Sequence, residues 1–273
     1  MPATPWHQAN VAFADWNSAE PTALAHLAPP LREAEDRGDL TSWFHIRKRP
    51  CWRIRYQPAT DGHDPVPAAL DALTAQGHIT GWTVSVYEPE IHAFGGPDAM
   101  DTAHRLFHQD SRHLTTHLHE GAGQRRETSL LLCSLLMRSA GLDWYEQGDA
   151  WARVAAHRPL TETAHPTSSD RHHDAVHRLI SVDTESLVHP TGPLAHLADW
   201  ARAYTDAATE LARLTASGHL HRGLRHVVAH HVLFAWNRAG LPQDDQATLA
   251  SAAKTVIFGP DPTTSRSHRA DTA

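Results

Sequence analysis

The chain has 273 residues, of which 41% are hydrophobic and 20% are charged, and its formal net charge is -7 at pH 7. That length suits one large domain or two small ones with a sizeable core, and the acidic balance argues against general nucleic-acid binding. The two cysteines, Cys51 and Cys133, exclude a disulfide framework and a four-thiolate zinc site.

The N-terminal sequence MPATPWHQAN lacks the basic-then-apolar pattern of a secretion signal. No apolar run approaches the roughly 20 residues needed to span a bilayer, so we expect a cytoplasmic protein. Histidine is unusually frequent, with 24 copies. The pairs His104/His108 and His113/His117 have the spacing that binds metal from one helix face, but no carboxylate or cysteine completes an evident set. We therefore expect no native metal site and no cofactor.

The first 40 residues predict two short helices separated at Pro29 and Pro30, the second covering about residues 30–36 and ending before Gly38. Two runs rich in aromatic and branched residues follow, Trp43–Arg47 and Trp52–Tyr56. The KRPC sequence between them predicts a hairpin or a closely spaced strand pair.

Alternation in the second of these strands places Trp52, Ile54 and Tyr56 on one face and Arg53 and Arg55 on the other. In the first strand His45 and Arg47 lie opposite Phe44 and Ile46, which predicts one strongly basic sheet face. Such a face is either a solvated outer surface or a surface that holds a carboxylate, backbone carbonyls or an acidic peptide.

A helix over residues 67–77 and a strand over residues 81–88 come next. In the strand, Thr83, Ser85 and Tyr87 share the face opposite Trp82, Val84 and Val86. Residues 95–97, GGP, favour a tight turn over a ligand-binding loop. The succession of strand, strand, helix, strand and helix predicts an α+β fold with a mixed or antiparallel sheet.

The helix expected over residues 97–118 has an apolar stripe that also contains Asp110 and Ser111. A buried carboxylate must be paired or hydrogen-bonded. Asp110 therefore either anchors a neighbouring loop or serves a polar pocket. Ser111 is a filler, a ligand for a substrate carbonyl or part of a proton relay, and no GxSxG sequence makes it a hydrolase nucleophile.

The C-terminal half is expected to be rich in helices, with a buried central helix over residues 124–142 and a long amphipathic helix ending at Gly218. His231 and Arg238 occupy positions where an apolar residue is typical. His231 is then a hydrogen-bonded core residue or a general acid or base beside a pocket. We expect a single domain over residues 1–259, with a mobile loop at about 159–172 and a disordered tail at 260–273.

Two stretches, YEPEIHAFGGPDAMDTAHRLFHQDS at 87–111 and HHVLFAWNRAGL at 230–241, resemble a known family. They are similar to the thiopeptide-type bacteriocin biosynthesis domain. That family includes the C-terminal glutamate-elimination domains of class I lantibiotic dehydratases and the stand-alone pyridine synthases of thiopeptide pathways. The resemblance runs from WFHIRKRP to the NRAGL helix.

The branch of the family is indicated by two departures. Elimination domains carry a histidine in an HLRLR strand and an arginine just before a YGG sequence. This chain has Trp52 and Ala93 at those positions. The RKRPCWRIR and EPEIHAFGG forms look like the pyridine synthases, which implies a formal [4+2] cycloaddition between two dehydroalanines. Glutamate elimination and a non-catalytic leader-binding scaffold are the alternatives.

The resemblance implies that these motifs lie near one another, and the chemistry suggests their roles. We expect Tyr87, Ser111 and His231 to form hydrogen bonds and transfer protons, with Asp110 orienting one of them. Trp52 and Trp236 offer flat surfaces for an azole-rich peptide. The remaining candidate substrate-binding residues are Arg53, Arg55, Ser85, Glu90, Asn237 and Arg238. The expected partner is a modified precursor peptide, with no nucleic acid or membrane; a homodimer or a complex with other maturation enzymes is left open.

Overall fold

The computed structural model describes residues 5–59, 63–121, 123–160 and 170–259. These residues form two compact units. The first takes its residues from Met1–Glu90, Met100–Arg125 and Asn237–Gly240, and the second from Ile91–Ala99, Arg126–Trp236 and Leu241–Ala273. The expectation of a single domain stays a prediction. The expected mobile loop lies mostly, and the expected tail wholly, outside the described residues.

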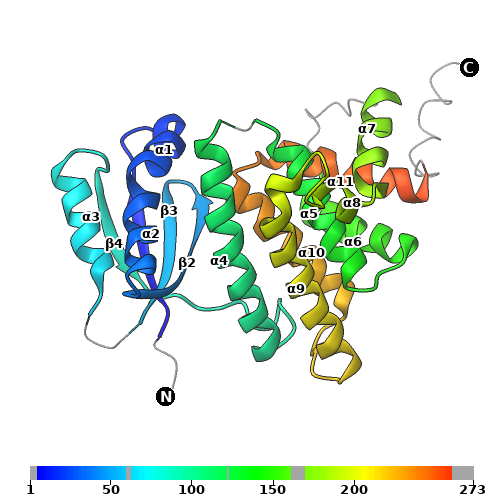
Figure 1. The fold of residues 1–273 in the computed structure, drawn as a ribbon, viewed down its shortest axis with the longest axis horizontal. Coiled ribbons are helices and arrows are strands. Elements are labelled where there is room, and N and C mark those ends of the chain that lie inside the picture. The colour runs from blue at the N-terminus through cyan, green and yellow to red at the C-terminus, as the bar shows by residue number, and fades with distance from the viewer. Residues whose placement is uncertain (1–4, 60–62, 122, 161–169, 260–273) are drawn as a thin grey trace, which may run out of the picture. The chain divides into compact units, whose positions relative to one another are not determined.

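The first unit is built on a four-stranded antiparallel sheet. The strands are β1 (His7–Ala12), β2 (Leu40–Lys48), β3 (Cys51–Pro58) and β4 (Gly81–Ser85), in the order β2-β3-β1-β4 (Figure 1). The predicted α+β class and the β2-β3 hairpin are confirmed. Strand β1 was not predicted, although Ala9 and Val11 alternate with Gln8 and Asn10 as in a half-buried strand.

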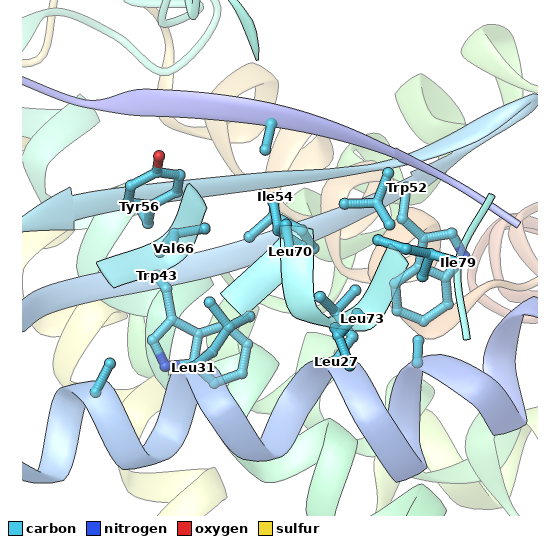
Figure 2. Close-up of a cluster of buried hydrophobic side chains, with 14 of the residues drawn as sticks. Leu27, Leu31, Trp43, Trp52, Ile54, Tyr56, Val66, Leu70, Leu73 and Ile79 are labelled. Carbon is cyan, nitrogen blue, oxygen red and sulfur yellow. The ribbon is translucent and has the colours of Figure 1, made fainter. Parts of the chain in front are cut away.

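Helices from two parts of the chain cover one face of this sheet. They are α1 (Trp16–Thr22), the π-helix η1 (Ala23–Leu27), α2 (Ala28–Asp36) and α3 (Pro65–Ala75). Leu31 of α2 and Leu70 of α3 pack with Trp43, Trp52 and Ile54 of the strands in one buried cluster (Figure 2). Burial of such side chains contributes about 1.5–3 kcal/mol each, so this cluster holds helices and sheet together.

The helical run from Trp16 to Asp36 is continuous, so the predicted break at Pro29 and Pro30 is wrong. The prolines stand in the first turn of α2, directly after the π-helical turn Ala23–Leu27. A proline in a helix interior removes a hydrogen bond and clashes with the preceding turn. A wider π-helical turn just before the prolines accommodates this irregularity without ending the helix.

The register of the hairpin overturns the prediction of one strongly basic sheet face. Phe44 pairs with Arg55 and Arg47 pairs with Trp52. Directly paired residues of antiparallel strands lie on the same face. Arg55 therefore shares a face with Phe44, whereas Arg47 lies on the face of Trp52 that is covered by helices. Alternation within each strand was right, but it does not determine the register between strands.

Strand β2 lies at one end of the sheet, and helix α4 (Pro97–His119) supplies partners to its backbone. The N–H of Trp43 lies 3.2 Å from Nδ1 of His108, and the N–H of His45 donates to Oγ of Ser111 at 3.3 Å. An unpaired edge strand is prone to pair with other chains. Polar side chains of α4 therefore satisfy backbone groups at this edge.

The second unit is helical, which confirms the helix-rich C-terminal half. Helix α5 (Arg125–Ser139) is buried nearly all round, as predicted, and α11 (Gln243–Phe258) packs on α6 (Trp144–His157). No helix within the described ranges is long and apolar enough to cross a membrane. The helices are α5 (Arg125–Ser139), α6 (Trp144–His157), α7 (Asp170–Ser181), α8 (Thr184–Val188), the 3-10 helix η2 (Ala195–Leu197), α9 (Ala198–Ala216), α10 (Leu224–Ala239) and α11 (Gln243–Phe258).

The paired glycines before α4 belong to a tight turn, as the sequence favoured. Gly95 and Gly96 have φ values of 90° and 116°, which side chains with a Cβ rarely adopt. A Cβ on Gly95 would lie 2.7 Å from Leu220, and one on Gly96 would lie 2.8 Å from the ring of His221. The backbone approaches the chain's own residues closely here, and the N–H of His221 donates to the carbonyl of Gly95 at 2.7 Å.

Candidate functional site

A polar row crosses the sheet on the face opposite the buried cluster. Ser85 pairs with Gln8, Gln8 with Arg55 and Arg55 with Phe44, so these four side chains share one face. The pairing confirms the prediction that Thr83 and Ser85 share one face of β4. It also confirms that Arg53 and Arg55 share one face of β3. A second row beside it contains Thr83, Asn10, Arg53 and Ile46.

Hydrogen bonds join the polar row into a network. Nε of Arg55 donates to Oε1 of Gln8 at 2.7 Å, and Nε2 of Gln8 donates to Oγ of Ser85 at 2.6 Å. The guanidinium of Arg55 also lies over the ring of Tyr87, 4.1 Å from its centre, a favourable cation–π contact. Arg55 and Tyr87 are both buried, and Ser85 is half-buried.

Tyr87 and His104 form a second polar pair next to Arg55. The Tyr87 hydroxyl and Nε2 of His104 lie 2.9 Å apart and share a hydrogen bond. Trp6 lies against His104, with 4.5 Å between ring centres. This contact helps to fix the orientation of the imidazole. His104 reaches the sheet face because α4 presents it one turn before His108.

Burial keeps both members of this pair neutral at pH 7. Burial lowers the pKa of His104 to about 4, and the positive charge of Arg55 lowers it further. Burial raises the pKa of the Tyr87 phenol, and the carboxylate of Glu90 adds to this increase. In this neutral pair the phenol can donate a hydrogen bond and the imidazole nitrogen can accept one, from each other or from a polar group of a ligand.

Arg55 offers a further donor at this site. Its Nη1 is buried and has no hydrogen-bond partner among the residues that the structure describes. Burial lowers the pKa of this guanidinium, but arginine stays charged at any ordinary pH. A buried cation with a spare donor suits a carbonyl or carboxylate oxygen of a ligand.

Asp110 and Ser111 are buried, as the helix pattern predicted, and each has a partner inside the first unit. Oδ2 of Asp110 lies 2.5 Å from Nε of Arg238, and both side chains are almost fully buried. Ser111 accepts the backbone N–H of His45, whose Nε2 lies 3.2 Å from the carbonyl oxygen of Arg238. These contacts join β2, α4 and the end of α10. The proposed catalytic roles of Asp110 and Ser111 stay predictions.

The other predicted residues occupy different surroundings. Trp52 is buried in the hydrophobic cluster (Figure 2). Its ring also stacks on His45, with 5.0 Å between ring centres. Glu90 is exposed, and Arg53 and Asn237 are half-buried. His231 and Trp236 belong to the second unit. There His231 lies edge-on to Phe94, and Trp236 stacks on Trp151.

Gln8 and His104 are the members of the polar face that sequence reasoning missed. Gln8 belongs to the strand that was not predicted. The spacing in the sequence indicates His104 only as half of a metal-binding pair with His108. In the structure His104 pairs with Tyr87, while His108 lies 3.1 Å from Glu35. The helical periodicity of residues 97–118 places His104 beside the apolar stripe that contains Asp110. The sequence pattern could therefore have indicated that His104 is buried.

The histidine environment predicts loss of stability in mild acid. The pKa of His45 is lowered to about 3 by burial, and that of His104 to about 4. Both values lie below the unfolded value of 6.5, so the unfolded chain binds protons that the folded chain excludes. The contribution of these histidines to the free energy of unfolding is therefore fully present above pH 6.5. It is lost as the pH drops towards 4, by about 1.4 kcal/mol per pH unit for each fully responding group.

Urea denaturation at pH 7 and pH 5 measures this effect. His104→Gln removes one of the two groups and should reduce the difference in unfolding free energy between the two pH values. An unchanged difference in this variant would contradict the neutral state of His104.

Comparisons with known proteins show the family of the chain and solved structures with a similar fold. A family model described as the lantibiotic biosynthesis dehydratase C-terminal region matches residues 6–257. The tRNA-dependent lantibiotic dehydratase MibB from Microbispora sp. 107891 has a similar structure, with a TM-score of 0.62 and 18% identity. TsrL is also similar, with a TM-score of 0.61 and 16% identity. At these identities the likeness concerns the fold.

The two solved structures differ in how much of them the chain covers. The match includes 98% of this chain but 29% of MibB, so the chain spans less than a third of that enzyme. With TsrL it includes 95% of this chain and 97% of TsrL. No curated protein matches the chain.

Proposed function

Because the chain belongs to the lantibiotic biosynthesis dehydratase C-terminal family, we propose that it matures a ribosomally made peptide by a formal [4+2] cycloaddition. One dehydroalanine supplies a C=C bond. A second supplies an azadiene through the iminol tautomer of its amide. Two new C–C bonds close a six-membered ring. Loss of the iminol oxygen as water, and of the leader peptide as a carboxamide, leaves a pyridine within a macrocycle.

The observation that carries this proposal is the neutral Tyr87–His104 pair beside Arg55. Formation of the iminol needs a proton delivered to the amide oxygen and one removed from the amide nitrogen. Tyr87 donates a proton to the amide oxygen. His104 accepts the proton from the amide nitrogen or returns a proton to Tyr87. The spare donor of Arg55 and the Ser85 hydroxyl hold neighbouring peptide carbonyls, which orients the reacting chain segments.

The choice of cyclisation over elimination rests on Trp52 and Ala93. The position at which elimination domains carry a histidine holds Trp52, whose side chain lies in the hydrophobic cluster. The position of their arginine holds Ala93, which has no charge to bind a carboxylate. Both substitutions remove groups suited to a glutamyl ester, and neither removes a group that cycloaddition needs.

Glutamate elimination is the second candidate, and the buried cation Arg55 favours it. A glutamyl group on serine or threonine carries a free carboxylate, and Nη1 of Arg55 is suited to bind one. In that reaction a base removes the α-proton of the modified residue, and the bond between its Cβ and the ester oxygen breaks as the Cα=Cβ bond forms. Glutamate leaves, and a dehydroamino acid remains.

Mass spectrometry of two incubations separates the candidates. A dehydrated, azole-containing precursor peptide should lose one water and its leader peptide and gain a macrocycle resistant to exopeptidase. A glutamylated precursor should remain unchanged. Loss of glutamate from the second peptide, with no change in the first, would establish elimination. Binding of the peptides without any mass change would leave a non-catalytic scaffold.

The first incubation also tests the other predicted site residues, each replaced by alanine. Those proposed to bind the substrate are Arg53, Glu90, Asn237 and Arg238. The remaining candidates are Trp52, Trp236, Ser111, Asp110 and His231. An alanine variant that cyclises the peptide at the wild-type rate would show that the replaced residue has no role in the site. Tyr87 and His104 are expected to have the largest effects.

A further inference from the structure

Gln8 holds the centre of the polar row on the sheet. It lies on β1, between Arg55 of β3 and Ser85 of β4, and its side chain is buried. Its Oε1 accepts from Nε of Arg55 at 2.7 Å. Its Nε2 donates to Oγ of Ser85 at 2.6 Å and to Oδ1 of Asn10 at 3.2 Å. Both amide hydrogens are therefore used inside the protein, so any effect of Gln8 on a ligand passes through its neighbours.

Arg55 sets the direction of these hydrogen bonds. A guanidinium group has donors and no acceptor, so the amide oxygen of Gln8 must face Arg55 and the amide nitrogen must face Ser85. A reversed amide would place the N–H groups of Gln8 against those of Arg55. Each buried donor left without an acceptor in this way costs about 1–3 kcal/mol. The guanidinium of Arg55 thus fixes the orientation of the Gln8 amide.

The orientation of Gln8 in turn determines what Ser85 can offer to a ligand. The Ser85 oxygen accepts an amide hydrogen of Gln8, so its own hydrogen points away from Gln8. That hydrogen has no acceptor among the residues that the structure describes. Arg55 likewise keeps Nη1 as an unused donor. The row therefore presents donors on either side of the Gln8 amide.

We propose that Gln8 is a positioning residue that makes Ser85 a hydrogen-bond donor, so that Ser85 and Arg55 bind two carbonyl oxygens of the peptide substrate. The Gln8 amide lies between the two donors, so they take oxygens from different peptide groups. The row selects a chain segment that turns two carbonyls towards the sheet. It rejects a segment that presents N–H groups there, because donor would meet donor. The proposal rests on the proposed action on a peptide.

The sheet does not need this network to hold its strands together. Residues 7–12 of β1 pair with β3 on one side, and residues 8–12 pair with β4 on the other. Ala9 and Val11 also anchor β1 in the hydrophobic cluster on the opposite face. Burial of the charged Arg55 among polar partners gives less stability than well-packed apolar residues would give. A role in binding accounts for a polar row at this place.

A double-mutant cycle tests the direction of the hydrogen bonds. Gln8→Glu keeps the length of the side chain and the acceptor for Arg55, but an ionised carboxylate has no hydrogen to donate. The Ser85 hydroxyl then donates to the new carboxylate and is lost as a donor for the substrate. The measured quantity is Kd of the dehydrated, azole-containing precursor peptide at pH 8, obtained by fluorescence anisotropy with a label on the leader.

Ser85→Ala should weaken binding about fivefold in the wild-type protein, the effect of one hydrogen bond. In the Gln8→Glu protein the same substitution should weaken binding by about twofold or less, because the Ser85 donor is already lost. Gln8→Glu alone should weaken binding about tenfold or more, since it also neutralises the charge of Arg55. An equal effect of Ser85→Ala in both proteins would overturn the proposal.

Gln57→Glu is the matched control for the change in charge. Gln57 is half-buried in β3, outside the polar row, and its Oε1 accepts from Thr41 at 3.3 Å. This variant should bind the precursor as the wild type does and keep the full effect of Ser85→Ala. Gln8→Met gives a second background without a new charge. It removes the donor that directs Ser85, so the effect of Ser85→Ala should again fall below its wild-type value, and a full effect would overturn the proposal.

Product analysis of the same proteins separates the role of Gln8 from the proposed function. If the wild type binds the precursor without forming a macrocycle, and the effect of Ser85→Ala still disappears in Gln8→Glu, the role of Gln8 stands and cyclisation fails. If the wild type forms the macrocycle, and Ser85→Ala has the same effect on Kd in every background, cyclisation stands and the role of Gln8 fails.

Discussion

Asp110→Ala is expected to lower the free energy of unfolding by about 3–5 kcal/mol, the range found when one partner of a buried ion pair is removed. The variant leaves the guanidinium of Arg238 buried without the carboxylate that lies 2.5 Å away. Arg238 also lies over the ring of Phe107, at 4.4 Å from its centre. That contact remains but does not replace a full negative charge. Urea denaturation measures the change.

Two controls isolate the ion pair as the cause. Asp101→Ala removes an exposed carboxylate from the same helix and should change stability by about 0.5 kcal/mol or less. The double variant Asp110→Leu with Arg238→Met removes both charges and should recover most of the loss, because apolar replacements of a buried pair are often tolerated. A stable Asp110→Ala protein with severely reduced activity would instead favour the predicted orienting role in catalysis.

Tyr87→Phe is expected to reduce kcat for product formation by about 10²–10⁴, the contribution of a positioned general acid or base. Phenylalanine keeps the ring beside Arg55 and removes the hydroxyl that bonds to His104. His104→Gln should cause a loss of similar size. Because the pKa of His104 is about 4, the imidazole stays a neutral base from pH 5 to pH 8, and this group should cause loss of activity only as the pH falls towards 4.

Tyr56→Phe provides the matched control for Tyr87. Tyr56 lies on the opposite face of the same sheet, where its hydroxyl donates to Asp64 at 2.9 Å. Its loss should leave kcat unchanged. Equal rates for Tyr87→Phe and the wild-type enzyme would show that the polar face of the sheet is not the active site.

The local parts of the fold followed from the sequence. Period-two alternation correctly placed Thr83 and Ser85 together, and helical phase correctly predicted that Asp110 and Ser111 are buried. These patterns depend on the geometry of a single element, which a short sequence specifies. The motifs at residues 87–111 and 230–241 also indicated the family to which the chain belongs.

Contacts between residues that are far apart in the sequence could not be predicted from such local patterns. The basic face failed because register is set by pairing between strands, and alternation within one strand does not reveal it. Gln8 was missed because a strand of only six residues, with Ala9 and Val11 as its alternating apolar residues, gives a weak signal. The partners of Asp110 and Ser111, Arg238 and the backbone of His45, come from positions 128 and 66 residues away, and no local pattern identifies such partners.

The most direct test of cyclisation at the polar face is one mass-spectrometric comparison. Wild-type protein, Tyr87→Phe and Tyr56→Phe are each incubated with the dehydrated, azole-containing precursor peptide. The proposed function predicts that the wild type and Tyr56→Phe release the leader carboxamide and one water to give a macrocycle, whereas Tyr87→Phe gives little product. Unchanged precursor with the wild-type protein, accompanied by loss of glutamate from a glutamylated peptide, would contradict it.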